Sequence, residues 1–324
     1  MQTDSEPLPA THGGSTLPRR LKRYALATRP AFFAASLAPV IVGTAAGGRS
    51  RGRIDWLPAI LALLATLFVH AAANVLNDVA DERSGSDRRN VDRIYPYTGG
   101  SRFIQNDVLA ASQMRNWGLM LQAVAIAIGL GLALMSGPWV IALGMAGVAL
   151  GACYSLPPVQ LASRGLGELT IAVTFGMLPF CGAAWLQAGA VDGLMILLSV
   201  PLTGWVTAIL LLNEVPDMAA DRAAHKYTLP VMLGLRRTRW IFVGLQLVSS
   251  AAIVLAAYLH ALHPLAIAGA ALLLLPGMRA AARIDHIDRH RLRRAIEATL
   301  QIHTLGSIFL FAGVWFAGNT VGSG

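Results

Sequence analysis

Two clusters of asparagine and aspartate, each followed by basic residues, are the part of this sequence best suited to chemistry. In the first cluster Asn77 precedes Asp81 by four positions, and in the second Asn213 precedes Asp217 by four. The clusters lie 136 positions apart, and an internal repeat would place them at equivalent points of the fold. We therefore predict that both clusters contribute to one site.

The spacing within the clusters favours a metal site. Asp221 follows Asp217 by four more positions, so on a continuous helix Asn213, Asp217 and Asp221 share one stripe, as Asn77 and Asp81 do on another. Gathered carboxylates repel one another and resist ionisation unless a cation lies between them. Oxygen ligands with open positions are typical of Mg²⁺, which also takes waters and substrate phosphates. The sequence therefore predicts a Mg²⁺ site.

A diphosphate held through Mg²⁺ also needs fixed positive charges. Arg222 and Lys226 follow the second cluster, one helical turn apart. The neighbouring loops on the same side add three candidates, Arg88, Arg102 and Arg164.

The elements that carry these residues belong to a membrane protein. The chain of 324 residues is 55% hydrophobic and 13% charged, with a mean hydropathy of +0.56, which is too apolar for a surface that faces water. The long apolar runs exclude a disordered chain and a coiled coil. There are only two cysteines, and both lie inside apolar runs, so a disulfide scaffold is excluded. A zinc site is not expected, because the sequence has no CxxC pair and no His/Cys cluster at ligand spacing.

Nine apolar segments approach the length of about 20 residues that a spanning helix needs. We predict an all-α polytopic fold of about nine transmembrane helices, arranged as two four-helix repeats plus one around a central cavity open to the cytoplasmic side. The expected segments are 30–48, 56–77, 117–135, 138–156, 168–188, 193–213, 240–260, 263–281 and 297–317.

The distribution of basic residues predicts the orientation. With a cytoplasmic N-terminus, 23 of the 26 lysines and arginines fall on the cytoplasmic side, as the positive-inside rule requires. This bias accounts for the net charge of +9, so no nucleic-acid partner is needed. We expect residues 1–24 to be a disordered cytoplasmic tail without a signal peptide, and residues 25–324 to be one domain in a bacterial-type inner membrane.

At these residues the chain resembles the UbiA family of intramembrane prenyltransferases, from the first apolar segment to the ninth. Within the family it is most similar to the 1,4-dihydroxy-2-naphthoate prenyltransferases of menaquinone synthesis, with which it shares four motifs in the same order. These are Asn77-Asp78, Asp81, Gly85 and Asp87 (NDxxDxxxGxD), then Pro-Tyr-Thr-Gly-Gly-Ser at 96–101, then Tyr154 with Arg-Gly-Leu-Gly-Glu at 164–168, and finally Asp217, Asp221-Arg222, Lys226 and Thr228-Leu229 (DxxxDRxxxKxTL).

The resemblance implies that an isoprenyl diphosphate binds through Mg²⁺ and passes its isoprenyl group to an aromatic acceptor. It adds Asp78 and Asp87 to the expected metal ligands. The full expected set is Asn77, Asp78, Asp81, Asp87, Asn213, Asp217 and Asp221.

Catalysis is expected from Asp81, Asp217 and Asp221 through stabilisation of the leaving diphosphate. Tyr154 could shield an allylic cation with its ring or orient the diphosphate. The isoprenoid tail could lie along the first and ninth spans or reach out between helices into lipid.

Acceptor contacts are expected from Asn74, one turn before Asn77, and from Tyr97 and Ser101. The last two belong to a glycine-containing loop that is expected to fold over the site.

Three departures from the family pattern leave the acceptor open. They are Gly85 where the broader family has a third acid, Glu214 where the naphthoate enzymes often have a second asparagine, and His225 where a glycine is common. The alternatives are the same fold with 4-hydroxybenzoate, homogentisate, a porphyrin-type ring or a specialised aromatic acceptor, or a terpene cyclase that needs no acceptor. A membrane transporter is disfavoured because the acids lie at the ends of the spans and not near the bilayer midplane.

Overall fold

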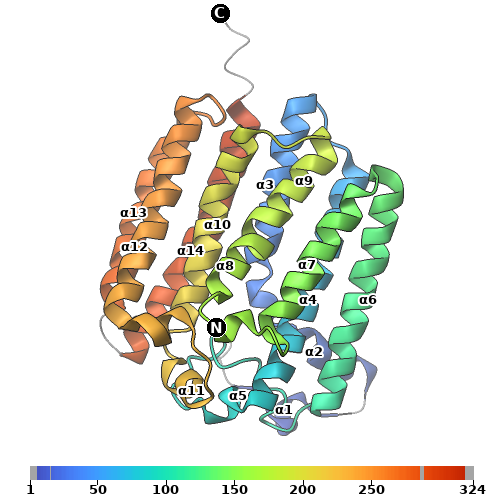
Figure 1. The fold of residues 1–324 in the computed structure, drawn as a ribbon, viewed down its shortest axis with the longest axis vertical. Coiled ribbons are helices and arrows are strands. Elements are labelled where there is room, and N and C mark those ends of the chain that lie inside the picture. Colours follow the sequence, from blue (N-terminus) through green and yellow to red (C-terminus); the bar gives the residue numbers. More distant parts are fainter. Residues whose placement is uncertain (1–5, 15, 285–287, 318–324) are drawn as a thin grey trace, which may run out of the picture.

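The computed structural model describes residues 6–14, 16–284 and 288–317, and long α-helices packed side by side make up most of it (Figure 1). The helices of the bundle are α3 Ala34–Arg51, α4 Trp56–Ser84, α6 Ala111–Ser136, α7 Trp139–Ser155, α9 Leu178–Ala188, α10 Gly193–Asn213, α12 Leu229–Tyr258, α13 Ala266–Arg283 and α14 Arg289–Phe316. The other helical segments are α1 Pro9–His12, α2 Leu17–Ala27, η1 Pro30–Phe32, α5 Ser86–Arg89, η2 Leu161–Ser163, α8 Gly167–Ile171, the π-helical turn η3 Ala172–Met177 and α11 Met218–Ala223.

This architecture confirms the predicted all-α polytopic membrane fold. Within the described residues, eight helical stretches are long and apolar enough to cross a membrane, counting η1 with α3 and α8 to α9 as single stretches. The remaining expected segment is α7, an apolar helix of 17 residues.

Two helices begin earlier than the hydropathy pattern predicted. Helix α12 starts at Leu229 and not near 240, and α14 starts at Arg289 and not near 297. The residues that precede these apolar parts include several arginines, namely Arg236, Arg237 and Arg239 in α12 and Arg289, Arg291, Arg293 and Arg294 in α14. These arginines lower the local hydropathy although the backbone around them is helical. In α12 the helix is interrupted at Gly234, whose φ of 74° and ψ of 167° are not helical. Hydropathy marks the apolar part of a helix, and these helices continue beyond it.

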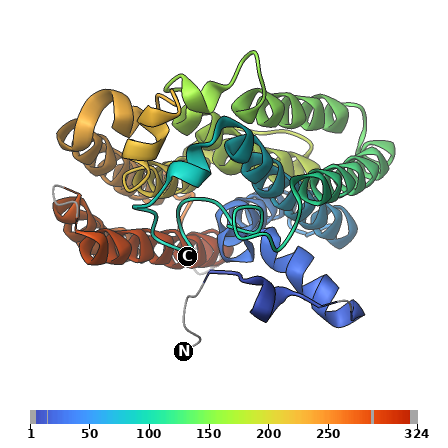
Figure 2. The ribbon, with the colours of Figure 1, turned by 90° about the horizontal axis from the view of Figure 1, so that it is seen from below.

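The helices form a ring when the bundle is viewed along its length (Figure 2). Helix α4 packs on α6, α3 on α9, α10 on α12 and α13 on α14, and α14 returns to α3 to close the ring. The contact between α3 and α9 is close because Gly43 and Gly47 face the backbone of Phe180 and Ala184, where a side chain at either glycine would overlap a carbonyl oxygen. Such small residues one turn apart are typical of helix pairs in membranes.

One end of the bundle carries nearly all the expected site residues, and we call it the acidic end. It consists of the ends of α4 and α10, the short helices α5 and α11, and the loop of residues 90–110 between α5 and α6. The opposite end carries short turns such as Gly137-Pro138 between α6 and α7.

The N-terminal segment packs against the acidic end, which differs from the disordered tail that we expected; residues 1–5 and 15 lie outside the described residues. Glu6 Oε1 accepts a hydrogen bond from Arg93 Nε at 2.7 Å, and Glu6 Oε2 lies 3.9 Å from Arg102 Nε and accepts from Asn106 Nδ2 at 3.2 Å. Partial burial raises the pKa of Glu6, but these hydrogen bonds hold it below its usual value. A further contact is the edge-to-face packing of His12 on Phe103.

We predict that Gly47→Val destabilises the bundle because the new side chain overlaps the backbone of Ala184. Overpacking of this kind costs about 1–3 kcal/mol, so the thermal unfolding temperature in detergent should fall. Gly129→Val in α6 is the matched control, since a Cβ added there meets no atom within 4 Å. Equal unfolding temperatures for the two variants would contradict the packing.

We also predict that Glu6→Gln loosens the 90–110 loop. The loss of a charge-assisted contact worth ~1 kcal/mol should raise the open population, and with it the rate of trypsin cleavage after Arg93, about fivefold. Asp107→Asn, at an exposed acid in the same loop, is the control and should cleave like the wild type. If the Glu6 variant also cleaves at the wild-type rate, the segment does not hold the loop.

Candidate active site

The two acidic clusters meet at Lys226. Its Nζ lies 3.4 Å from Asp81 Oδ2, at the end of α4, and 3.7 Å from Asp221 Oδ1 in α11. Ser86 Oγ donates a hydrogen bond to Asp221 Oδ1 at 2.7 Å, which adds a second link between the halves. The repeat in the sequence therefore corresponds to two helix ends that meet in space.

The loop of residues 90–110, which contains Gly99 and Gly100, contacts both clusters. The amide of Ser101 donates to Asp78 Oδ2 at 3.0 Å, and the amide of Gly99 donates to Asp217 Oδ2 at 3.2 Å. Gly100 has a φ of 74°, and a Cβ there would overlap Asp87 Oδ2. The loop can approach the acids this closely because glycine has no side chain and tolerates a positive φ.

The second cluster does not form the continuous helical stripe that we expected. Helix α10 ends at Asn213, and α11 begins only at Met218, because Pro216 lies between them and proline disfavours a helical conformation at the residue before it. As a result Asn213 lines the pocket described below, whereas Asp217 accepts from Asn90 Nδ2 at 2.7 Å in the loop.

Burial makes ionisation of these acids unfavourable. It raises the pKa of Asp87 to about 8, with further contributions from Asp81 and Asp78, and it raises the pKa of Asp221 to about 6. Burial also raises the pKa of Asp217, against its hydrogen bonds from Asn90 and the loop.

Lys226 is the cation at the centre of this cluster. Burial alone lowers its pKa, but the adjacent carboxylates of Asp81 and Asp221 raise it well above the usual value, so this side chain is positively charged. Beside it, burial and the neighbouring Glu168 raise the pKa of Glu214 well above the usual value for a carboxyl group. The cluster therefore holds more carboxyl groups than one lysine neutralises.

The expected metal ligands gather in this region without forming a closed cage. Within residues 6–14, 16–284 and 288–317, no three acidic, histidine or cysteine side chains are arranged to hold a metal ion. Several buried oxygens nevertheless have no hydrogen-bond partner, namely Asp78 Oδ1, Asp87 Oδ2 and Asn213 Oδ1. A buried, acid-rich cluster with unpartnered oxygens fits a hard divalent cation.

The expected diphosphate cations have different positions. Lys226 lies between the acids, and Arg102 is buried beside them with its Nη1 donating to the Asp87 carbonyl at 2.6 Å. The other three form contacts elsewhere: Arg88 with Glu82 at 2.6 Å, Arg164 with the Pro158 carbonyl at 2.8 Å and Arg222 with the Val231 carbonyl at 3.1 Å.

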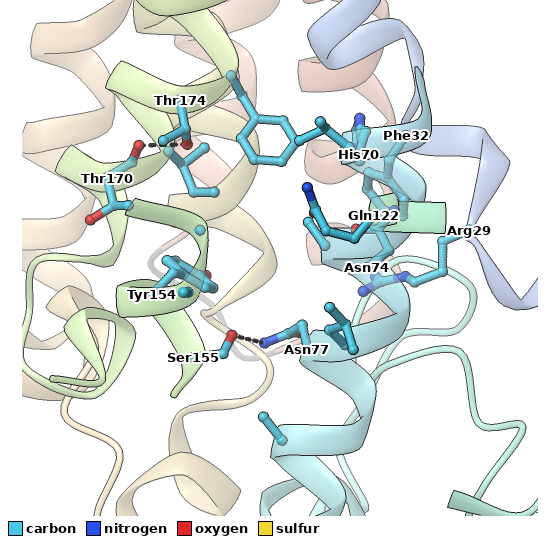
Figure 3. A pocket seen from close by; sticks show the side chains of 18 of the residues that line it. Arg29, Phe32, His70, Asn74, Asn77, Gln122, Tyr154, Ser155, Thr170 and Thr174 are labelled. Atoms are coloured by element: carbon cyan, nitrogen blue, oxygen red, sulfur yellow. Dashed lines mark hydrogen bonds between the residues drawn. The ribbon is translucent and has the colours of Figure 1, made fainter. Parts of the chain in front are cut away.

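An apolar pocket of about 500 Å³ lies beside the acids, among η1, α4, α6, α7, α8, η3 and α10 (Figure 3). On one wall Tyr154 and Ser155 face Asn77, whose Nδ2 donates to Ser155 Oγ at 3.2 Å. The asparagines Asn77 and Asn213 line the pocket, and the aspartates of both clusters are absent from its lining residues. The pocket therefore has an asparagine-lined polar end next to the buried acids.

The other wall holds polar groups that sequence reasoning missed. Arg29 lies over the ring of Phe32, with its Cζ 4.8 Å from the ring centre, and donates from Nη2 to the Tyr97 carbonyl at 2.8 Å. Its Nε is buried without a partner. Gln122 lies nearby with a buried, unpartnered Nε2. The only hint in the sequence is that Arg29 directly precedes the first apolar segment.

The expected acceptor residues separate into two groups. Asn74 lines the pocket beside Arg29 and donates to the Thr28 carbonyl at 2.9 Å. Tyr97 and Ser101 do not line the pocket. The Tyr97 hydroxyl donates to Glu297 at 3.4 Å, and the Ser101 amide donates to Asp78. Arg83 and Arg115 line the pocket instead, at the acidic end.

Comparison with known proteins identifies the family of this chain. The profile of the UbiA prenyltransferase family matches residues 36–308. A 1,4-dihydroxy-2-naphthoate octaprenyltransferase of Mycobacterium tuberculosis is 33% identical over 218 residues, which cover 67% of this chain and 72% of that protein.

The fold is shared with solved structures of low sequence identity. A UbiA homologue from Aeropyrum pernix has a TM-score of 0.65 at 18% identity, covering 86% of this chain and 96% of that one. A UbiA homologue from Archaeoglobus fulgidus bound to DMAPP and Mg²⁺ has a TM-score of 0.63 at 17% identity, covering 89% and 98%. The family match over most of the chain confirms the resemblance seen in its motifs: this protein belongs to the UbiA prenyltransferase family and is a membrane-embedded prenyltransferase.

Proposed function

We propose that this protein uses Mg²⁺ to transfer an isoprenyl group from a prenyl diphosphate to an aromatic acceptor, and that the acceptor is 1,4-dihydroxy-2-naphthoate or a similar quinone precursor. The observation that carries the proposal is the meeting of two acidic helix ends beside an apolar pocket with an asparagine-lined polar end. The name of the mycobacterial relative supports the choice of acceptor. The ligands of the Archaeoglobus homologue support the donor and the metal.

The metal would be held by oxygens of the two clusters. The unpartnered oxygens of Asp78, Asp87 and Asn213 are available to it, and Asn77, Asp81, Asp217 and Asp221 complete the proposed set. When bound, Mg²⁺ would neutralise negative charge that accumulates on the diphosphate as it leaves.

The chain's own residues supply the remaining functions. Lys226 places a fixed positive charge between the clusters, where it can stabilise the departing diphosphate. The bond between the prenyl carbon and the diphosphate oxygen breaks, and its electrons leave with the diphosphate. A π electron pair of the acceptor ring then forms the new C–C bond. The same ring carbon loses its former substituent, a proton or, where it carries a carboxylate, CO₂, and the bonding electrons return to the ring. Tyr154 and the apolar walls exclude water, which would otherwise capture the allylic cation as an alcohol.

The pocket wall that holds Arg29 and Asn74 suits an acceptor that is an aromatic acid. Arg29 offers a buried, unpartnered N–H beside the rings of Phe32 and His70, and an arginine in this setting pairs well with a carboxylate. Asn74 lies on the same wall and can contact a ring hydroxyl. A naphthoate carries both a carboxylate and hydroxyl groups on a flat aromatic ring.

We further propose that the acidic end faces the cytoplasm of a bacterial-type inner membrane. The support is the bias of 23 of 26 lysines and arginines toward that end. Both substrates would then meet the enzyme at the inner leaflet.

We predict that Asp81→Ala and Asp217→Ala each reduce transfer by about 10²–10³-fold or more, since each removes stabilisation of the leaving diphosphate. The measurement is the transfer of label from a radioactive prenyl diphosphate by purified protein. Chelation with EDTA should stop the wild-type reaction, and added Mg²⁺ should restore it. Asp92→Ala, at an exposed acid of the adjacent loop, is the control. Wild-type rates in both cluster variants, or full activity in EDTA, would refute the metal site.

We predict that Arg29→Gln acts selectively on acceptors that carry a carboxylate. The KM for 1,4-dihydroxy-2-naphthoate should rise roughly tenfold or more, because a hydrogen bond to a charged group is worth about 1.5–3 kcal/mol. The KM for 1,4-dihydroxynaphthalene, which lacks the carboxylate, should stay within about twofold. Arg236→Gln, at an exposed arginine that does not line the pocket, should change neither value. An equal rise in KM for both acceptors would mean that Arg29 has a packing role only.

A wider panel of aromatic acceptors tests which acceptor the protein uses. Transfer to 4-hydroxybenzoate or homogentisate in preference to the naphthoate would replace the proposed acceptor, and consumption of the donor without any acceptor would indicate a cyclase.

A further inference from the structure

Helix α2 lies at the acidic end, beside the ring of helices and not in it (Figure 1, Figure 2). Its inner side belongs to a hydrophobic cluster with α4, α6 and the 90–110 loop, in which Ala27 is fully buried. The ring of Tyr24 lies 5.3 Å from that of Trp117 in α6, and the Trp117 indole N–H donates to the Tyr24 carbonyl at 3.1 Å. One side of α2 is therefore fixed to the bundle.

The outer side of α2 presents an apolar stripe. Leu17, Leu21 and Ala25 are spaced by four positions, so they lie on one face of the helix. Leu17 is 68% exposed and Leu21 is 62% exposed. The described part of the chain leaves this stripe uncovered. Exposed apolar side chains on a surface helix indicate contact with a membrane or another protein.

Basic residues flank the stripe. Arg19, Arg20 and Lys22 are all exposed, and within the part of the chain that the structure describes none of their side chains forms a hydrogen bond or an ion pair. Residues 7–54 contain no aspartate or glutamate, so nothing nearby in the sequence neutralises these charges. An apolar face with basic flanks is typical of helices that lie on anionic membranes.

The position of α2 on the bundle matches the membrane boundary. Its partner Trp117 follows the exposed polar residues Arg115 and Asn116 in α6. It precedes Leu119 and Met120, which are apolar and more than half exposed. This change from polar to apolar exposure marks the level at which α6 enters the membrane, where tryptophan and tyrosine are enriched. Helix α2 therefore lies at the level of the lipid headgroups.

We propose that α2 binds the bilayer surface and selects anionic phospholipids. Leu17 and Leu21 enter the apolar part of the leaflet at the acidic end. Arg19, Arg20 and Lys22 contact the phosphates of negatively charged headgroups, which complement them in charge. A second copy of this chain, docked through the same stripe, would bring like charges together, and this disfavours it as the partner.

The end of α2 leads directly into the pocket wall. Thr28 follows the helix, and its carbonyl accepts a hydrogen bond from Asn74 Nδ2 at 2.9 Å. Arg29 comes next and lines the pocket. A lipid that holds α2 in place therefore also holds this wall. Because the wall is the proposed acceptor site, this second step rests on the proposed function, whereas lipid binding by α2 does not.

The first test needs no turnover. Leu21 is replaced by the photoreactive p-benzoylphenylalanine in the full chain, and the protein is placed in nanodiscs of mixed phosphatidylcholine and phosphatidylglycerol. After irradiation we expect captured lipid with phosphatidylglycerol enriched over its share of the bilayer. Arg19→Gln, Arg20→Gln and Lys22→Gln together should return the captured lipid to the bilayer composition. Capture of protein alone, or no enrichment with the basic residues intact, would overturn the proposal.

A matched control separates α2 from the general basic charge of the protein. Arg236→Gln, Arg237→Gln and Arg279→Gln together remove three exposed arginines of α12 and α13. The enrichment at position 21 should persist in this variant. An equal loss in both triple variants would mean that the charge of the whole end attracts the lipid, and it would refute selection by α2.

The second test measures turnover in vesicles. The KM for the aromatic acceptor should be about fivefold higher in phosphatidylcholine alone than in the mixture, since one basic side chain near an anionic surface contributes a preference of about that size. Repulsion of an anionic acceptor by the charged surface acts in the opposite direction. In the triple α2 variant the KM should show no such fall when phosphatidylglycerol is added.

The two tests fail separately. Enriched capture with a KM that does not respond to lipid would keep the lipid site and refute its effect on the pocket wall. If no acceptor supports transfer, the proposed function fails, and the captured lipid still decides whether α2 selects anionic phospholipids.

Discussion

The central constraint on this structure is electrostatic: buried carboxylates from two helix ends lie close together, which costs free energy. Like charges in a poorly hydrated region raise the energy of every ionised acid, and the raised pKa of Asp87 and of Asp221 records that cost. Lys226 offsets part of it by contacting both clusters, and the loop offsets more through the amides of Gly99 and Ser101. The remaining unpartnered oxygens are where a divalent cation would stabilise the site further.

The same interactions explain why the loop is glycine-rich and why the N-terminal segment packs where it does. Gly100 must approach Asp87 without a side chain, so glycine is required at this point of the loop. Its position is fixed from outside by Glu6, which contacts Arg93 and Arg102. Arg93 in turn donates to the Asn90 carbonyl at 2.6 Å, and Asn90 binds Asp217. Glu6, near the start of the chain, is thus connected through Arg93 and Asn90 to the second acidic cluster.

The sequence predicted the features that follow from periodicity and repetition, namely the apolar segments, the membrane fold and the meeting of the two clusters. It did not predict whether the side chains of Arg88, Arg222 and Arg29 point toward the site or away from it. Arg88 and Arg222 belong to the short helices α5 and α11, whose directions are set by Gly85 and Pro216 and not by the preceding span. Arg29 was missed because a left-handed residue before a proline places its side chain by tertiary packing, which no local pattern encodes.

The arrangement of polar and apolar groups also separates two requirements of the proposed reaction. Charge must be concentrated where the diphosphate leaves, yet the carbon that it leaves must not meet water. The asparagines Asn77 and Asn213 line the pocket, whereas the aspartates of both clusters, which the loop contacts, do not. A neutral amide can contact an anionic leaving group without bringing a second negative charge toward it. Carboxylates at those two positions would add negative charge beside the diphosphate, so asparagine is the residue that the geometry favours there.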